Sequence, residues 1–267
     1  VEPAGTTAAR LATVGPGADP ALDGWIVPNP WPEVVDERRR TASLPPLLAV
    51  EGQPLGRSPL GIAVWKERAQ RLAAVCGTAI TWKCLGDAAV ANYWFGVNDP
   101  WAAIEFGRLD PDTDAMGLLV LGQAVSSYFG TATVATNDLD ADDRFPQWFA
   151  ALKRHSIRGD TPLTEMLITN GAKYDAVGTV RAEAPANDMR VDLLYPEPMA
   201  TADVVLATAG TSNARAARRA VTADNAGKAL VRAGWTAPGG PGLPPANGLP
   251  SGGLLLQLQN RWHGVAR

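Results

Sequence analysis

Three carboxylates spaced two residues apart are the first feature of this sequence that could do chemistry. Asp110, Asp112 and Asp114 lie in "DPDTDAMG", directly before an apolar run. Oxygens at positions one, three and five are typical of a calcium loop, but an EF-hand loop also needs Gly at position six and Glu at position twelve. Ala115 and Leu121 occupy those positions, and the later "DLDADD" fails the same test. The sequence therefore predicts no metal site.

Helix capping is the alternative role for these acids. Carboxylate and hydroxyl oxygens accept the free N–H groups of a first helical turn, and negative charge complements the helix dipole. Asp112, Thr113 or Asp114 can do this for a helix that begins near Ala115. We therefore interpret the acids first as caps.

Signatures of catalysis are absent from the sequence. His155 and His263 are the two histidines, and neither lies beside a Ser or Cys nucleophile in a recognised pattern. No GxSxG, GxxxxGK[ST] or GxGxxG motif occurs, so the nucleophile elbow, the P-loop and the dinucleotide fingerprint are missing. The sequence therefore favours a protein that is not an enzyme and that uses no cofactor.

Charge and hydropathy limit the kinds of partner that this protein can have. The 267 residues are 46% apolar and carry a formal charge of −3, with no long run of Lys and Arg. Nucleic acid is therefore not an expected partner, because phosphate backbones require a basic footprint. No apolar segment reaches the roughly 18 to 20 residues that span a bilayer. The sequence as given is expected to form a soluble globular chain.

Strands alternate with helices along the chain. The best strands are "SPLGIAVW" (58–65), a nearly continuous apolar run typical of a strand buried on both faces, and "ADVVLATAG" (202–210). Further strands are expected at 23–28, 174–180 and 191–196, and helices at 31–42, 66–76, 114–129, 143–155, 164–172 and 212–234. Gly234 is placed to stop the last helix, and 236–253 is expected to be irregular. The alternation predicts an α/β fold whose sheets are mainly parallel and flanked by helices.

Cys76 and Cys84, the two cysteines, bracket "GTAITWK". A disulfide between them needs a turn that brings their Cα atoms within about 7 Å. The other interpretation is a pair of buried thiols, which pack as small apolar residues. The spacing matches no CxxC redox or zinc pattern.

Seven short segments occur in an order that resembles a known family. They are "DGWIVPNPW", "SPLGIAVW", "ITWKCL", "GRLDPDTDAMGLLVL", "TPLTEMLITNG", "KYDAVGTV" and "LLYPEPMATADVVLA". This succession is similar to that of bacterial extracellular solute-binding proteins of the type 2 periplasmic-binding fold, and most of all to actinobacterial members, which are often tethered to the membrane. The resemblance covers about residues 20–235.

The resemblance implies two α/β lobes joined by crossing strands near 58–62 and 199–206, with a solute in the cleft between them. Lobe I would comprise 1–58 and 203–267, and lobe II would comprise 59–202. The implied function is extracytoplasmic binding of a small polar solute, with a membrane transporter or an attached membrane anchor as partner. The alternative is a ligand-free cell-surface scaffold or interaction domain built on the same fold.

Eight positions match the family's cleft motifs one at a time. The implied ligand-binding residues are Asn29, Trp31, Ser58, Thr113, Asp114, Thr164, Glu165 and Tyr195. Asp114 stands where the family's "DPxTSxxG" segment commonly has Ser. A carboxylate at that helix start repels an anion, so we expect a neutral or cationic solute rather than an oxyanion.

Two departures from the family pattern concern the first lobe and the cleft. Family members begin with a strand and a helix that seed the first lobe, whereas about 20 residues precede Asp23 here. We therefore expect either a reduced first lobe or a first part that lies outside this sequence. After "YDAVGT", where the family often has Tyr-Glu, Val180 and Arg181 follow.

Overall fold

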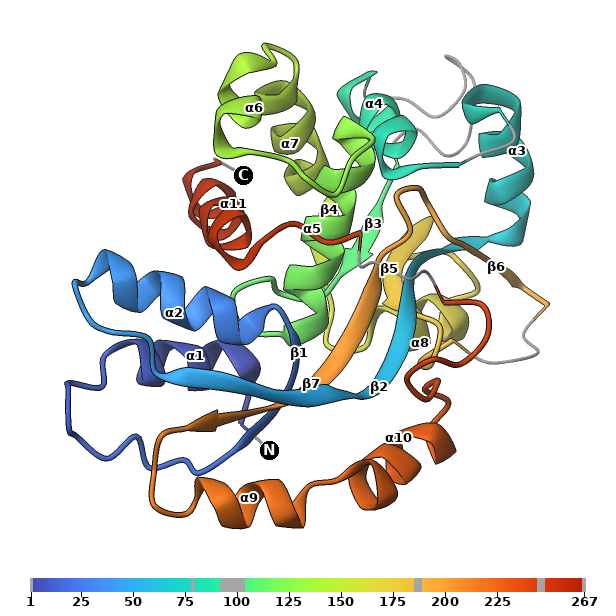
Figure 1. Ribbon diagram of the computed structural model, residues 1–267. Coiled ribbons are helices and arrows are strands. Elements are labelled where there is room, and N and C mark those ends of the chain that lie inside the picture. Colours follow the sequence, from blue (N-terminus) through green and yellow to red (C-terminus); the bar gives the residue numbers. More distant parts are fainter. Residues whose placement is uncertain (1, 78–79, 92–103, 185–188, 244–247, 266–267) are drawn as a thin grey trace.

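The structure, a computed structural model, describes residues 2–77, 80–91, 104–184, 189–243 and 248–265. In this part of the chain the strands form one path, β1-β7-β2-β5-β3-β4, and β6 pairs with β2 outside that path (Figure 1). The strands are β1 (Trp25–Asn29), β2 (Leu48–Trp65), β3 (Phe106–Arg108), β4 (Ser156–Arg158), β5 (Ala176–Val180), β6 (Val191–Leu194) and β7 (Thr201–Ala209).

Strand β2 joins two sheets because it changes partner halfway along its length. Its pairing with β7 ends at Pro59, opposite Thr201, and its pairing with β5 begins at Leu60. Strands β1, β7 and the first part of β2 form sheet A, and the end of β2 with β3–β6 forms sheet B. Ser58 lies opposite Ala202, so the predicted pairing of the two crossing strands is confirmed.

Helices cover both faces of sheet A. On one face lie α1 (Ala4–Ala12) and α2 (Trp31–Thr41), and on the other lie α9 (Ala214–Ala220), the π-helical turn η1 (Ala223–Gly227) and α10 (Lys228–Arg232), as Figure 1 shows. Strand β1 is the edge of this sheet among the described residues, and its Ile26 side chain is half exposed.

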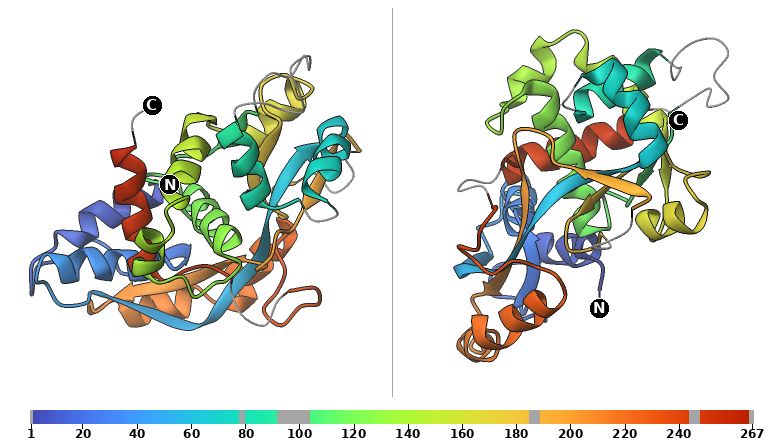
Figure 2. Two further views of the ribbon diagram at one scale, coloured as in Figure 1. Left: turned by 90° about the horizontal axis from the view of Figure 1, so that it is seen from above. Right: turned by 90° about the vertical axis from the view of Figure 1, so that its right-hand side faces the viewer.

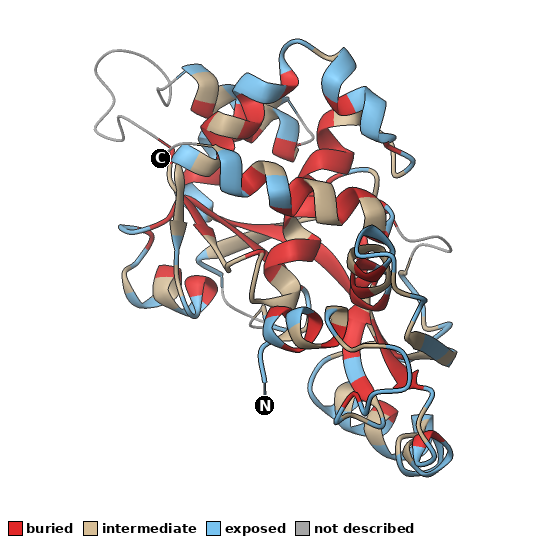
Figure 3. Cartoon of the chain, turned by 90° about the vertical axis from the view of Figure 1, so that its left-hand side faces the viewer, coloured by how far each residue is buried: buried red, intermediate tan, exposed pale blue. Residues whose placement is uncertain are grey.

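Sheet B carries one long central helix, α5 (Ala115–Phe129), which packs against β5 and β2. Beyond α5 lie α4 (Trp82–Ala91), α6 (Thr136–Ala141) and α7 (Phe145–Arg154). Helix α8 (Pro162–Ile168) contacts β3 and β5. Helix α3 (Lys66–Cys76) begins directly after β2. Figure 3 shows α5 and the middle of the sheets as the most buried part of the molecule.

The last described helix, α11 (Gly252–Gly264), connects the two halves of the molecule. It packs against α2 and α5, and the left view of Figure 2 shows it beside the α1–α2 pair. Leu255, Leu258 and Trp262 of α11 are buried in one apolar cluster that also contains Val34 of α2 and Leu118 of α5. The hydrophobic core is therefore continuous from one sheet to the other.

The predicted α/β architecture is confirmed, but the prediction of mainly parallel sheets is wrong. Among the described residues, β3 pairs in parallel with β4 and β5, while β1–β7, β2–β5, β2–β6 and β2–β7 are all antiparallel. The crossing strands explain the difference, because β2 and β7 run in opposite directions and provide most of the pairing.

Several elements differ from the sequence-based expectation. No element was predicted for helices α1, α4 and α6, for strands β3 and β4, for the first half of β2 or for most of α11, whose first two residues lie in the stretch expected to be irregular. Residues 244–247 of that stretch lie outside the described residues. The single helix expected at 212–234 is broken, because Val221 and Thr222 are extended between α9 and η1. Gly234 does end the last turn, with φ +92°.

Of the two interpretations of the cysteine pair, the disulfide is the one that the structure shows. Cys76 and Cys84 are bonded, with their Cα atoms 5.7 Å apart, and the bond ties the end of α3 to α4. None of the described helices combines the length and the apolar character that crossing a bilayer requires.

Candidate functional site

The acidic turn before α5 caps that helix. Asp114 is the N-cap, and its Oδ1 accepts from the backbone N–H groups of Met116 at 2.8 Å and Gly117 at 3.1 Å. Asp110 folds the turn, because its Oδ1 accepts from the N–H of Asp112 and its carbonyl accepts from the N–H of Asp114. The described residues contain no group of three or more acids, His or Cys placed to hold a metal. Capping is therefore the observed role of Asp114.

A pocket of about 350 Å³ opens beside this helix start. It lies between the N-termini of α5 and α8 and the end of β5. Its polar lining consists of acids and hydroxyls: Asp114, Asp160, Glu183, Thr161, Thr164 and Thr179. No Lys, Arg or His is among its described lining residues.

Glu183 shows the electrostatic character of this pocket. Glu183 is an exposed residue by surface area, yet it lines the pocket, where surrounding protein atoms partly desolvate its carboxylate. Desolvation raises its pKa above the ordinary Glu value, the negative charge of Asp114 raises it further, and a hydrogen bond from Thr179 at 3.4 Å opposes the shift. The two carboxylates repel each other, and the described lining holds no basic side chain to offset this repulsion. A bound cation would offset it.

Asp114 and Thr164, of the residues expected to bind a ligand, line this pocket. Thr113 lies directly before Asp114, and its carbonyl accepts from the N–H of Gly5 at 3.0 Å. A Cβ on Gly5 would lie 1.8 Å from the carbonyl oxygen of Asp112. Glycine is therefore required where α1 approaches the acidic turn.

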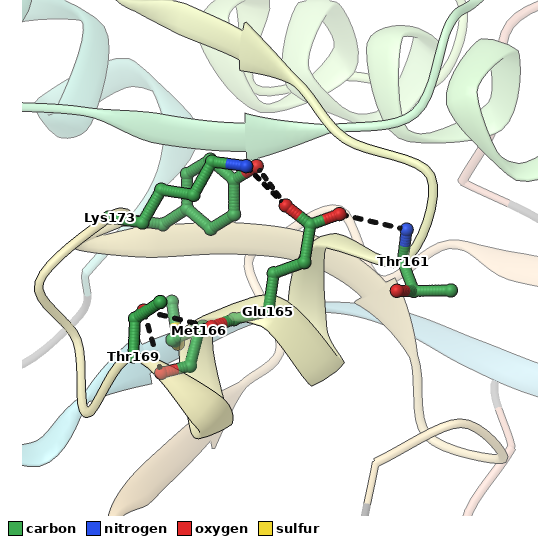
Figure 4. A network of polar contacts seen from close by, with 6 residues as sticks. Thr161, Glu165, Met166, Thr169 and Lys173 are labelled. Atoms are coloured by element: carbon green, nitrogen blue, oxygen red, sulfur yellow. Dashed lines mark hydrogen bonds and ion pairs between the residues drawn. The ribbon is translucent and has the colours of Figure 1, made fainter.

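Glu165 is engaged in its own network at the start of α8, shown in Figure 4. Its Oε2 accepts from Lys173 at 2.5 Å and from the Tyr174 hydroxyl at 2.7 Å, while Oε1 accepts from the Thr161 N–H at 3.2 Å. The bonds from Lys173 and Tyr174 lower the pKa of Glu165 to about 2. Glu165 is therefore ionised and holds α8, and it is absent from the pocket lining.

Ser58 and Tyr195 lie along the crossing strand rather than in the pocket lining. The buried Ser58 hydroxyl accepts from the N–H of Ala182 at 3.0 Å. This bond positions the backbone next to Glu183. Tyr195 lies against Gly61, and burial raises the pKa of its hydroxyl.

Asn29 and Trp31 come from the sheet A side. Trp31 is fully buried, and its indole N–H donates to the carbonyl of Ala115 at 3.1 Å. It therefore joins α2 to the first turn of α5 and has no exposed surface to offer a solute. Asn29 ends β1, and its Oδ1 is buried without a hydrogen-bond partner among the described residues.

Sequence reasoning missed four of the six polar lining residues: Asp160, Thr161, Thr179 and Glu183. Asp160 and Thr161 lie in "GDTPLTE", where a polar pair before Pro and a helix is a signal that could have placed them at the helix start. Glu183 has no motif of its own. It lies shortly after the position where the resemblance led us to expect a Glu, and only the fold brings it to Asp114.

Similarity to known proteins appears in the fold alone. No protein-family model matches the chain, and no curated protein does either. Solved structures do match. A periplasmic thiamin binding protein superimposes with a TM-score of 0.62 at 14% identity, covering 100% of this chain and 85% of that one.

Two further structures agree with that match. Iron-bound HitA from Pseudomonas aeruginosa has a TM-score of 0.59 at 16% identity, covering 99% of this chain and 88% of that one. A putative spermidine/putrescine ABC transporter from Listeria monocytogenes has a TM-score of 0.53 at 13% identity, covering 89% and 73%. The chain has the two-lobe α/β fold of the type 2 periplasmic binding proteins. In this periplasmic-binding fold, α5 and α8 both begin at the acidic pocket.

Proposed function

We propose that this protein is an extracytoplasmic solute-binding protein that holds a small polar cation in the pocket between α5 and α8, for transport or sensing, and performs no chemistry on it. The observation that carries the proposal is the pairing of Asp114 and Glu183 in a pocket whose described lining has no basic side chain. A cation bound there replaces the repulsion between the two carboxylates by attraction.

The size of the pocket and the fold support this role. A volume of about 350 Å³ lies within the range of small-molecule sites. The structures of the same fold include proteins named for thiamin, for iron and for spermidine and putrescine. Among the eight residues proposed as ligand-binding, Asp114 and Thr164 are therefore the primary contacts, with Glu183 and Asp160 added.

We also propose the lobe boundaries and the partner. The change of β2 from β7 to β5 between Pro59 and Leu60 supports a division into 1–58 with 203–267 and 59–202. An ABC transporter in the membrane is the partner that delivery of a solute requires. The resemblance extends the proposal to an actinobacterial lineage and to a membrane tether.

A second candidate, the ligand-free scaffold, is favoured by one observation. The Pro/Gly-rich tail packs on the crossing strand, where Arg57 and Thr236 exchange two backbone hydrogen bonds of 2.8 Å and Arg181 donates to the Thr236 hydroxyl at 2.8 Å. The tail therefore fills space beside the crossing strands but is absent from the lining of the acidic pocket.

A thermal-shift screen tests the proposal. It would cover polyamines, amino acids, sugars, metal cations and oxyanions. A ligand at a hundredfold excess over its Kd stabilises the folded state by about 2.7 kcal/mol, which raises the Tm of a chain of this size by about 5–10 °C. A shift with organic or inorganic cations supports the proposal, a shift with oxyanions alone contradicts it, and no shift with any class favours the scaffold.

A further inference from the structure

The outer layer of sheet A, from α9 to α10, concentrates positive charge on one face. Between Ala214 and Arg232 the chain has four Arg and one Lys against a single acid, Asp224, although its formal charge is −3 overall. All five cations are exposed: Arg215, Arg218, Arg219, Lys228 and Arg232. The rest of the chain is therefore more acidic than its total charge indicates, and the molecule is electrically polarised.

The packing of these helices turns the cations outward. Ala214 and Gly227 are buried, and the Leu230 side chain lies over Gly56 of β2. Small and apolar residues thus face the sheet. Figure 1 shows α9 and α10 following one another beneath the sheet, and the helices at the bottom of Figure 3 are largely exposed.

Three of the five cations have no ion-pair partner among the described residues: Arg215, Arg219 and Arg232. Arg218 pairs with Glu51 at 2.6 Å, and Lys228 lies 3.4 Å from Asp224 in a pair that is mostly exposed. Exposed pairs of that kind contribute little to stability. The charge of this face is therefore not neutralised within the protein.

An apolar hollow accompanies the charge. A pocket of about 400 Å³ beside α10 is lined by Leu55, Ala237 and Pro238 together with Val231, whose surface is 46% exposed. Lys228 and Arg232 stand at the same pocket. Cations beside exposed apolar surface on a helix are the combination found on protein surfaces that lie in the headgroup region of a bilayer.

We propose that the α9–α10 face docks this protein on an anionic lipid surface. The positive charges are spread over two successive helices rather than converging on one point, which fits an extended negative surface better than a small anion. The choice of lipid over an acidic protein rests on the proposed role in uptake at a membrane, whereas the surface itself stands on its charge and exposure. Docking there orients the molecule without a membrane-spanning helix.

The test is binding of the full chain to vesicles. The protein would be sedimented with phosphatidylcholine vesicles at low and at physiological salt. One set of vesicles also contains phosphatidylglycerol, at about one anionic lipid in three. This content gives the negative surface potential that attracts basic segments. We expect binding to the anionic vesicles only, weakened by salt because exposed charges are screened over about 8 Å at 0.15 M.

A charge-neutralised variant makes the test specific. Each Lys or Arg near an anionic surface contributes about 1 kcal/mol, so Arg215→Gln, Arg219→Gln and Arg232→Gln together should weaken binding by roughly 100-fold. The matched control neutralises three exposed Arg residues elsewhere: Arg40, Arg144 and Arg154.

Equal loss of vesicle binding in the two triple variants, or no binding of the wild type to anionic vesicles, overturns the proposal. The α9–α10 variant should keep any solute-induced thermal shift, so that failure here is separable from failure of the solute-binding role.

Discussion

The side-chain amide of Gln259 donates a hydrogen bond of 2.7 Å to the carbonyl of Pro111, in the acidic turn before α5. The same side chain accepts from Arg38 of α2 at 2.9 Å, and Gln259 is only 1% exposed. One buried residue of α11 thus connects a helix of sheet A to the turn that carries Asp114.

Replacing Gln259 by Ala should destabilise the protein. The substitution leaves a buried carbonyl and part of a guanidinium without a partner, which costs about 1–3 kcal/mol. Urea or thermal unfolding measures the loss. Asn260→Ala, at the exposed next position of the same helix, is the matched control and should change stability by less than about 0.5 kcal/mol. Equal effects of the two substitutions would show that the buried amide contributes nothing specific.

Asp114→Ser should change ligand selectivity more than stability. Ser is also a good N-cap, so α5 keeps its first-turn hydrogen bonds. The variant loses one of the three carboxylates that line the pocket, and we expect affinity for a cation to fall about tenfold. Calorimetric titration with the cation that gives the largest thermal shift measures this.

Asp143→Ser removes an exposed acid that is absent from the pocket lining, and it should leave cation affinity unchanged. An unchanged Kd for Asp114→Ser as well would reduce Asp114 to a helix cap without a role in binding.

Cation binding should weaken on acidification, starting above the pH at which an ordinary Glu titrates. Desolvation in the pocket and the charge of Asp114 raise the pKa of Glu183, so its carboxylate becomes neutral at a higher pH than that of an ordinary Glu. A bound cation needs the ionised form. Kd measured from pH 7 down to pH 4 should rise for the wild type, and Glu183→Gln should flatten that rise.

The same raised pKa has an opposite effect on the unliganded protein. Because the folded pKa of Glu183 lies above the unfolded one, its ionisation disfavours folding as the pH rises from about 4.5 through the folded value. Glu183→Gln should therefore gain relative stability at neutral pH and none at low pH. A stability difference that is the same at both pH values would contradict this.

Loss of the disulfide should lower stability without moving the pocket. Cys76 and Cys84 close a short loop, with a sequence separation of 8, for which loop-closure entropy predicts about 2–3 kcal/mol. Cys76→Ser with Cys84→Ser measures this by denaturant unfolding. Peptide mass spectrometry of non-reduced, alkylated protein should find the two cysteines linked, and two freely alkylated thiols would contradict the bond.

The features that the sequence predicts well are those whose cause is local. Asp114 caps α5 because an acid precedes an apolar helical run, and the crossing strands stand out because continuous apolar runs are buried on both faces. The disulfide also has a local cause, because a short loop with one turn is enough to bring Cys76 to Cys84.

What the sequence could not predict depends on distant neighbours. Glu183 meets Asp114 only because β5 lies beside α5. The first half of β2 contains Gly, Pro and charged residues because it is partly exposed and its pairing shifts between Glu51 and Gly56. Trp31 looked like a ligand contact from its motif, yet packing against α5 buries it completely.

Strand β7 lies between β1 and β2 in sheet A, and this order has a consequence for how the protein is made. Strand β1 and the first part of β2 leave the ribosome with no sheet A neighbour to pair with, because β7, the strand that separates them, is encoded more than a hundred residues later. At about 5–20 residues per second, they wait on the order of 10 s for it. During translation these segments of sheet A therefore stay unpaired until β7 is made, while all strands of sheet B precede β7 and can already assemble.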